Sequence, residues 1–194
     1  MKIVGTGVLE LYRLWARART RLLTTLIRGA FLKFGDASVV QAPIRLKGED
    51  AIEIGARVVI GPHSWLEVLD QNTSRGPVIS IGDGTSAAGF LTITAVERVV
   101  IERNVLIARY VYISDHSHES KSTRIPIKSQ GVTKISPVRI CEGAWLGQGV
   151  VVCPGVTIGR NSVIGANSIV RHDVPDCSVA AGMPAEILRR LDHS

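Results

Sequence analysis

Six aliphatic residues in the C-terminal third of the chain recur at every sixth position: Ile140, Leu146, Val152, Ile158, Ile164 and Val170. The residue four places after each of the first five is always small or β-branched (Ala144, Val150, Val156, Ser162 and Ser168). A period of six fits neither the 3.6-residue turn of a helix nor the alternation of an ordinary strand. It is typical of a parallel β-helix, in which short strands and tight corners repeat along a prism. The pattern therefore predicts an all-β prism filled by these side chains, against the alternative of chance turns in a β-sandwich.

The same spacing occurs in three earlier stretches: Ile54, Ile60 and Leu66; Ile81, Ala87 and Ile93; Ile101, Ile107 and Ile113. The phase is lost between Leu66 and Ile81, and again between Ile113 and Ile140. Stacked coils absorb insertions as loops on one face, and such loops often carry binding residues. We therefore expect a prism domain over residues 36–178 with a projecting loop over residues 114–137, and we expect the chemistry at the two interruptions.

The N-terminal segment, residues 1–35, predicts an amphipathic helix over residues 8–30. One face carries apolar residues (Leu11, Leu14, Trp15, Ala18, Leu22 and Leu26), and another carries a stripe of Arg13, Arg17, Arg21 and Arg28. The arginines argue against a transmembrane span, and the segment lacks the features of a signal peptide. Two interpretations stay open and are compatible. The helix caps the prism or packs on a neighbouring subunit, or it lies on an anionic membrane surface.

The net charge of +6 belongs to this segment rather than to the prism. Residues 1–35 hold seven basic residues and one acidic residue, whereas the rest of the chain holds 16 of each sign. A neutral prism argues against nucleic acid as a partner. Three cysteines without a CxxC spacing favour reduced thiols in the cytoplasm and give no support for a metal site. We therefore expect a cytoplasmic protein, with attachment to the inner face of the cytoplasmic membrane as the open alternative.

Three segments together resemble a known family: "ISDHSH" at Ile113–His118, the repeats of Val138–Pro175, and "AAGMPAEILRR" at Ala180–Arg190. They are similar to the hexapeptide-repeat acyltransferases, and in particular to the galactoside, maltose and nodulation-factor O-acetyltransferases and to those of polysaccharide and O-antigen biosynthesis. The resemblance implies a left-handed parallel β-helix closed by a short C-terminal helix over residues 179–194. It also implies a homotrimer with interfacial active sites, and acetyl-CoA as co-substrate.

Such an enzyme needs a base that removes the proton of an acceptor hydroxyl. Histidine suits this role, because its ordinary pKa near 6.5 leaves a neutral imidazole at physiological pH. The resemblance assigns the base to His116, and His118 is the alternative base or an acceptor ligand. Asp115 would point away from His116 in an extended backbone. It could orient the imidazole only if the chain turns there.

The resemblance also carries cofactor-binding residues onto the last coils: Trp145, Gly147, Gln148, Ala166, Arg171, His172 and Arg189. His172 stands where the family usually has lysine, and Glu186 stands where a cation is frequent, so the phosphate contacts are the least secure part of the set. Each of these residues also has a plain structural alternative, since corner residues, packed aromatics and solvated arginines occur in any such prism.

Acceptor contacts are expected at the interruptions, from Trp65, Asp70, Asn72 and Arg124. Polar side chains beside an aromatic ring can hold a sugar, although a solvated loop explains them equally well. The sequence thus predicts an acetyl-CoA-dependent O-acetyltransferase acting on a sugar hydroxyl of a surface polysaccharide or O-antigen. The alternatives are an N-acetyltransferase of a nucleotide-linked amino sugar, a structural β-helix, and a zinc-dependent carbonic anhydrase on the same prism.

Overall fold

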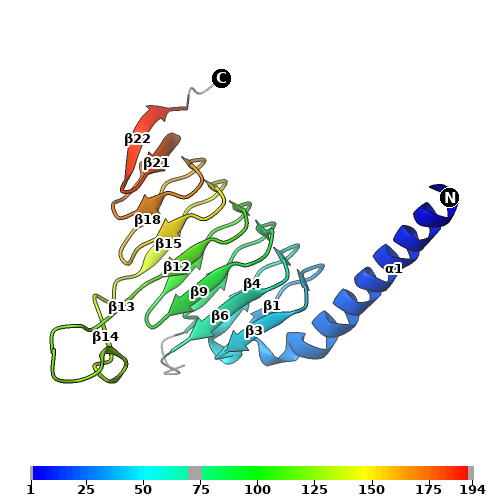
Figure 1. Ribbon diagram of the computed structural model, residues 1–194, viewed down its shortest axis with the longest axis horizontal. Helices are drawn as coiled ribbons and strands as arrows, with labels where there is room; N and C mark the ends of the chain where they lie inside the picture. The colour runs from blue at the N-terminus through cyan, green and yellow to red at the C-terminus, as the bar shows by residue number, and fades with distance from the viewer. Residues whose placement is uncertain (1, 70–75, 192–194) are drawn as a thin grey trace.

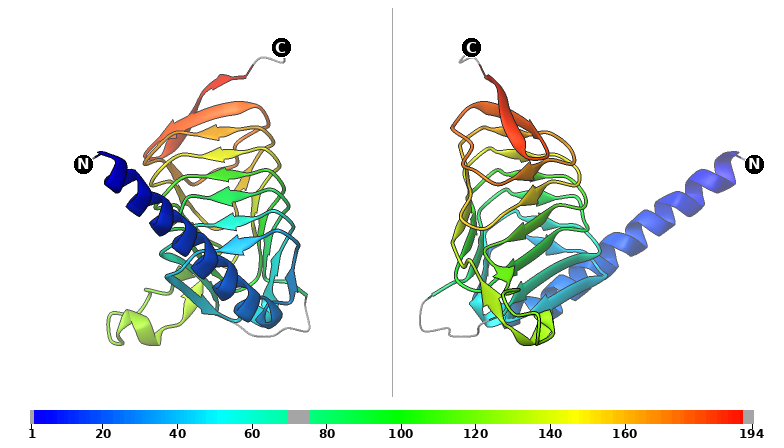
Figure 2. Two further views of the ribbon diagram at one scale, coloured as in Figure 1. Left: turned by 90° about the vertical axis from the view of Figure 1, so that its right-hand side faces the viewer. Right: turned by 60° about the vertical axis from the view of Figure 1, so that its left-hand side comes forward.

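The computed structural model describes residues 2–69 and 76–191, and it describes side chains from residue 6 onward (Figure 1). Short strands coil into a triangular prism whose three faces are parallel sheets. Because successive coils stack directly on one another, residues one coil apart in sequence become neighbours across a sheet. Figure 2 shows the stacked coils from two further sides.

Each full coil contributes one strand to each face. The first sheet contains β1 (Lys33–Phe34), β4 (Ile52–Ile54), β7 (Ile79–Ile81), β10 (Val99–Ile101), β15 (Val138–Ile140) and β18 (Thr157–Ile158). The second contains β2 (Val39–Val40), β5 (Val59–Ile60), β8 (Ser86–Ala87), β11 (Leu106–Ile107), β16 (Trp145–Leu146), β19 (Val163–Ile164), β21 (Ser178–Gly182) and β22 (Ala185–Arg190). The third contains β3 (Ile44–Lys47), β6 (Ser64–Val68), β9 (Thr92–Ala95), β12 (Tyr112–Ser114), β17 (Val151–Val152) and β20 (Ile169–Val170).

The hexad residues fill the prism as predicted. Ile140 pairs with Ile158, Leu146 with Ile164, and Val152 with Val170, and all six side chains are at most 1% exposed. The small and β-branched residues four places on are buried as well. Removing each large aliphatic side chain from water stabilises the fold by about 1.5–3 kcal/mol. The stack of aliphatic residues is therefore the core.

Gly147 shows why a corner of this prism needs glycine. A Cβ atom on Gly147 would lie 2.7 Å from the amide nitrogen of Ala166, on the corner of the next coil. Contacts this short do not occur for real side chains, so alanine there would push two coils apart.

The C-terminal part of helix α1 (Lys2–Ile27) crosses the first coil, and its N-terminal part projects away from the prism (Figures 1 and 2). The Thr24 hydroxyl accepts a hydrogen bond from the Val40 amide at 3.1 Å, and an Arg19 guanidinium nitrogen donates to the Ala42 carbonyl at 3.1 Å. The short 3₁₀ helix η1 (Arg28–Ala30) then leads into β1. The predicted N-terminal helix is thus present, and only its last turns pack on the prism.

The apolar face of α1 is not covered by its own chain. Leu11, Leu14, Trp15, Leu22 and Leu26 are between 56% and 73% exposed. An exposed row of large apolar side chains marks a surface that meets another molecule. Among the described helices, none combines the length and the apolar character needed to cross a bilayer.

The predicted C-terminal closing helix is wrong. Strands β21 and β22 form an antiparallel hairpin that extends the second sheet, with Val179 opposite Arg189. Gly182, at φ 114°, and Pro184 make the turn between them, and neither residue suits a helix interior. Residues Ala185–Arg190 favour a helix locally, but pairing with β21 decides their conformation.

The long interruption between β12 and β15 leaves the prism in the middle of the stack and projects outward from it (Figure 1). Strand β13 (Ser117–His118) pairs antiparallel with β14 (Val132–Thr133), and the 3₁₀ helix η4 (Ile127–Ser129) lies between them. The 3₁₀ helix η2 (Glu49–Ala51) precedes β4.

Two adjacent valines on β10 test the interior assignment with the same substitution. Val99 is fully buried, whereas Val100 faces outward and is half-buried. Val99→Ala should lower the free energy of unfolding by about 2 kcal/mol, because it removes two buried methyl groups and leaves a cavity. Val100→Ala should cost less than about 1 kcal/mol. Urea unfolding of both variants at one protein concentration measures the difference, and equal losses would contradict this orientation of the strand.

Candidate active site

His116 lies just past the end of β12, where the chain leaves the prism for the projecting loop. Its side chain is only 5% exposed, which is unusual for a loop histidine. The chain bends at Asp115, so that Asp115 and His116 come to the same side of the backbone. The turn that the sequence left as an alternative is therefore the conformation observed.

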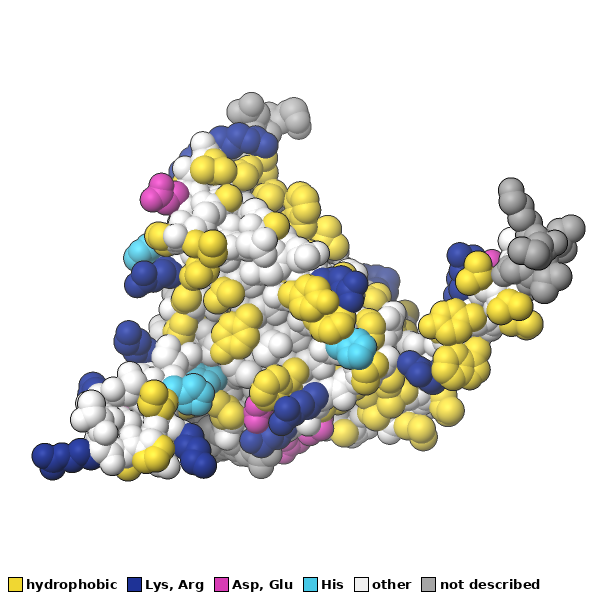
Figure 3. Space-filling view, viewed as in Figure 1, with side chains coloured by type: hydrophobic (Ala, Val, Ile, Leu, Met, Phe, Trp, Pro, Cys, Tyr) yellow, Lys and Arg dark blue, Asp and Glu magenta, His cyan; other side chains and the backbone are white. Residues whose placement is uncertain are grey.

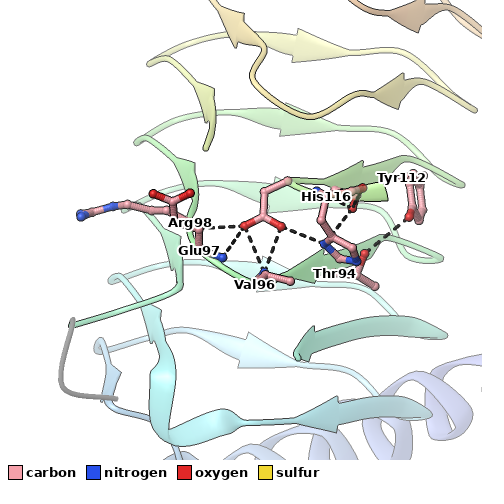
Figure 4. A network of polar contacts seen from close by, with 8 residues as sticks. Thr94, Val96, Glu97, Arg98, Tyr112 and His116 are labelled. Carbon is pink, nitrogen blue, oxygen red and sulfur yellow. Dashed lines mark hydrogen bonds and ion pairs between the residues drawn. The ribbon is translucent and has the colours of Figure 1, made fainter. Parts of the chain in front are cut away.

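Asp115 is fully buried and binds His116 directly. Asp115 Oδ1 lies 2.9 Å from His116 Nδ1. The carboxylate also accepts hydrogen bonds from three consecutive backbone amides, those of Val96 (2.9 Å), Glu97 (2.7 Å) and Arg98 (2.8 Å), at the corner between β9 and β10 (Figure 4). These amides come from the coil below. Together they supply the hydrogen bonds that a buried carboxylate needs.

This arrangement decides which imidazole nitrogen is basic. An ionised carboxylate only accepts hydrogen bonds, so Nδ1 of His116 carries the proton toward Asp115. Nε2 is then the free base of the neutral ring. Ser114 supports the same geometry, because its hydroxyl donates to the His116 carbonyl at 2.9 Å and lies 3.3 Å from Nδ1. The pair therefore has the arrangement of a general base held by a carboxylate.

A hollow of about 260 Å³ opens beside His116. Tyr112, Ser114, Ser117 and His118 line one side, and Val151–Pro154 of the next coil line the other. His118 is exposed, and its ring lies edge-on to that of His116 with centroids 6.4 Å apart. Three of the sequence candidates, Asp115, His116 and His118, thus meet at one place.

The expected cofactor residues divide between two corners of the prism. Trp145, which is 48% exposed, lies on β16 of the second sheet, and Gly147, Gln148 and Ala166 stack on the corner that follows this sheet. Arg171 and His172 are exposed on the opposite corner of the third sheet, directly above Cys153 of the His116 hollow. Arg189 is exposed on β22.

The expected acceptor residues are not gathered at His116. Trp65 lies on β6 of the third sheet, and Arg124 is exposed in the projecting loop and does not line the His116 hollow. Asp70 and Asn72 lie outside the described residues. Trp65 does border a hollow of its own, on the same face as His116.

Sequence reasoning missed the amides of residues 96–98, which hold Asp115. Backbone amides leave no signature in a sequence, and these come from a coil separated from Asp115 by 17–19 residues. The hydroxyls of Ser114 and Tyr112 were also missed. Tyr112 Oη lies 3.5 Å from Thr94 Oγ1, one strand below it.

The three cysteines are free thiols, and burial raises the pKa of Cys141. Cys153 borders the His116 hollow. Across residues 2–69 and 76–191, no group of three histidine, cysteine or acidic side chains is placed to hold a metal ion.

Comparison with known proteins places this site in a family. The family "Bacterial transferase hexapeptide (six repeats)" matches residues 137–172. The chain is 32% identical to WbbJ of Escherichia coli K12, a candidate lipopolysaccharide biosynthesis O-acetyl transferase, over 82% of each protein. The chain belongs to the hexapeptide-repeat acetyltransferase family. It is therefore an acyltransferase built on a left-handed parallel β-helix, as the sequence predicted.

Other relatives agree with this assignment. The galactoside O-acetyltransferase of Escherichia coli K12 is 39% identical over 69% of this chain and 64% of its own. The hexapeptide-repeat acetyltransferase VCA0836 of Vibrio cholerae, solved with acetyl coenzyme A, is 28% identical, with a TM-score of 0.63 over 87% of this chain and 75% of its own. The N-acyltransferase AntD of Bacillus cereus shares the fold, with a TM-score of 0.73 over 88% of both chains at 18% identity.

The contact between Asp115 and His116 can be tested by changing charge without changing shape. In Asp115→Asn, the amide nitrogen would face Nδ1 and the proton of the ring would move to Nε2, which is then no longer basic. We expect kcat for acyl transfer to fall by about 10²–10⁴-fold. Asp83→Asn is the matched control, because Asp83 also accepts a backbone hydrogen bond, from Ala56 at 2.8 Å, away from the site. Equal activity of the two folded variants would contradict the proposed role of Asp115.

Proposed function

We propose that this protein transfers the acetyl group of acetyl-CoA to a hydroxyl of a sugar that belongs to a surface polysaccharide or O-antigen, or to its precursor. The observation that carries the proposal is the buried pair of Asp115 and His116 beside an open hollow. The acceptor class rests on the similarity to WbbJ and to galactoside O-acetyltransferase, whose names specify O-acetyl transfer.

His116 acts as the general base in this proposal. Nε2 takes the proton of the acceptor hydroxyl while the hydroxyl oxygen bonds to the thioester carbonyl carbon. The tetrahedral oxyanion that forms is stabilised by backbone N–H groups. The carbon–sulfur bond then breaks, and the imidazolium returns the proton to the sulfur of coenzyme A. Asp115 keeps Nδ1 protonated throughout and stabilises the transient positive charge.

Subunit contacts complete the site in our proposal. Arg171 and His172 share a corner with the His116 hollow, whereas Trp145, Gly147, Gln148 and Ala166 stand on another corner of the same prism. One extended cofactor reaches both sets most directly if they come from two neighbouring subunits. We therefore propose a homotrimer in which His116 of one subunit faces the Trp145 corner of the next. Arg171, His172 and Arg189 are the candidates for the phosphates of coenzyme A.

Acceptor contacts are proposed for Trp65, whose ring lies on the same sheet as Tyr112 of the His116 hollow, and for Arg124 of the projecting loop. Aromatic rings pack against the apolar faces of sugars. His118, which is exposed at the mouth of the hollow, is proposed as a further acceptor ligand.

The two histidines provide the test of the base. His116→Ala should lower acetyl transfer to a galactoside, measured as release of free coenzyme A thiol, by about 10²–10⁴-fold. His118→Ala should keep kcat within about tenfold and raise KM for the acceptor. Loss of activity in His118→Ala alone would move the base to His118.

Transfer to an amino sugar that stops when its nitrogen is blocked would favour N-acetylation, and an acetyl mass increment on a hydroxyl favours the proposal.

We further propose that α1 holds the enzyme at an anionic membrane surface, close to a lipid-linked acceptor. The exposed row of Leu11, Leu14 and Trp15 and the neighbouring Arg13 and Arg17 support this proposal, because leucine, tryptophan and arginine suit the interface of an anionic bilayer.

A charge-preserving control separates the membrane proposal from simple helix packing. Arg17→Gln with Arg21→Gln should weaken sedimentation with phosphatidylserine vesicles by roughly 10–30-fold, since each basic residue contributes about 1 kcal/mol near such a surface. Arg13 is left unchanged, because Glu10 pairs with it at 2.6 Å. Arg17→Lys with Arg21→Lys should bind like the wild type. Equal binding of all three proteins, or equal binding to neutral vesicles, would contradict membrane attachment through charge.

A further inference from the structure

A second hollow lies on the same face of the prism as His116. Its volume is about 360 Å³, and Arg45, His63, Trp65 and Thr92 are among the residues that line it. Figure 3 looks onto this face, where basic, histidine and hydrophobic side chains are prominent and acidic side chains are few. Neither the family assignment nor the proposed chemistry at His116 requires this hollow.

The strand register joins the two hollows. Arg45 on β3, Trp65 on β6, Thr92 on β9 and Tyr112 on β12 occupy the same outward position on four successive strands. Neighbouring strands lie about 4.8 Å apart, so Trp65 and Tyr112 are separated by about 10 Å. Thr92 lines the second hollow, and Tyr112 lines the hollow of His116. The small side chain of Thr92 lies between the two aromatic side chains in this row.

Arg45 is a cation without a carboxylate partner in the part of the chain that the structure describes. Its guanidinium lies over the Trp65 ring, with Cζ 4.3 Å from the centroid. The neighbouring cation on the same two strands is paired, because Lys47 Nζ lies 2.9 Å from Glu67 Oε1. One pair of outward positions on β3 and β6 thus carries a neutralised ion pair, and the adjacent pair carries an unneutralised guanidinium on an indole.

The indole nitrogen of Trp65 is a second observation that points to a ligand. Nε1 is buried and, among the described residues, meets no hydrogen-bond acceptor. Buried donors are nearly always paired in folded proteins, and an unpaired one indicates a missing partner. Because Arg45 covers the ring, movement of the guanidinium toward a ligand would open the indole to that ligand at the same time.

We propose that Arg45 and Trp65 form a second acceptor subsite that binds a negatively charged unit of a glycan, about two sugar units away from the unit acetylated at His116. This inference rests on the proposed function and specifies its substrate class. Arginine binds carboxylates and phosphates through two parallel hydrogen bonds, and the indole supplies a flat apolar surface for a sugar ring. The preferred acceptor is therefore an acidic oligosaccharide, bearing a uronate or a phosphate, rather than a neutral monosaccharide.

Matched acceptors test the charge requirement. We compare a galactose-containing trisaccharide whose third unit is a neutral hexose, the same trisaccharide with a uronic acid as third unit, and a version with a phosphate on that unit. The wild type should show kcat/KM at least about tenfold higher for an acidic acceptor than for the neutral one. Whichever of the uronate and the phosphate gives the larger gain identifies the anionic group.

Variants assign that preference to the subsite. Arg45→Gln should reduce the ratio of kcat/KM for acidic over neutral trisaccharide to about one, and Arg45→Glu should invert it. Trp65→Ala should raise KM for both trisaccharides. The double variant Lys47→Gln with Glu67→Gln is the matched control, because it removes the neighbouring ion pair and leaves the net charge of the face unchanged, and it should keep the wild-type ratio. A preference lost equally in that double variant, or absent from the wild type, overturns the inference.

A binding measurement keeps the inference separate from the proposed reaction. Calorimetric titration of the trisaccharide with a uronic acid as third unit should show binding that Arg45→Gln weakens by about tenfold and that His116→Ala leaves intact. Binding independent of Arg45 overturns the subsite, whatever the enzyme acetylates. Arg45-dependent binding without any His116-dependent acetyl transfer would support the subsite and remove the proposed function.

Discussion

The structure depends on one constraint, which is that every coil must place its aliphatic side chains directly on those of the coil below. Ile140 stacks on Ile158 and Leu146 stacks on Ile164, and the two residues of each pair lie on neighbouring strands of one sheet. Both residues of each stacked pair are buried, so the hydrophobic effect stabilises the prism along its whole axis. A shift by a single residue would turn a strand's core side chains to the outside. Fixed register in the interior therefore also fixes which residues become neighbours on the outer faces, and the site is built from those neighbours.

The contact between Asp115 and His116 shows how neighbouring coils build a candidate site. His116 follows β12 of one coil, and the amides that hold Asp115 belong to the corner of the preceding coil. Within residues 2–69 and 76–191, no lysine or arginine pairs with this buried carboxylate, and three peptide amides and an imidazole supply its hydrogen bonds. The arrangement is pre-organised, because the groups that orient the proposed base belong to the stacked coils.

The three outer faces of the prism differ in the side chains that they expose. The first sheet presents charged side chains that pair with one another, as Arg139 does with Glu102, and that pairing lowers the pKa of Glu102 although burial opposes the shift. The second and third sheets present Leu106, Trp145 and Tyr112, which are 40–51% exposed. The second and third sheets thus expose large apolar side chains, and the third also carries the ion pair of Lys47 and Glu67. The exposed apolar face of α1 adds a further contact surface, distinct from the prism.

The sequence by itself determined the prism, its interior residues and the histidine at the main interruption, because a six-residue period is a property of neighbours along the chain. It could not determine the features that need residues from different coils. The bend at Asp115, the amides of residues 96–98 and the alignment of Arg45 with Tyr112 depend on contacts between distant segments. The predicted helix at residues 185–190 was wrong for the same reason, because pairing with β21 overrides the local preference for a helix. Periodic burial is written locally, whereas hydrogen-bond partners and outer-face neighbours exist only once the coils have stacked.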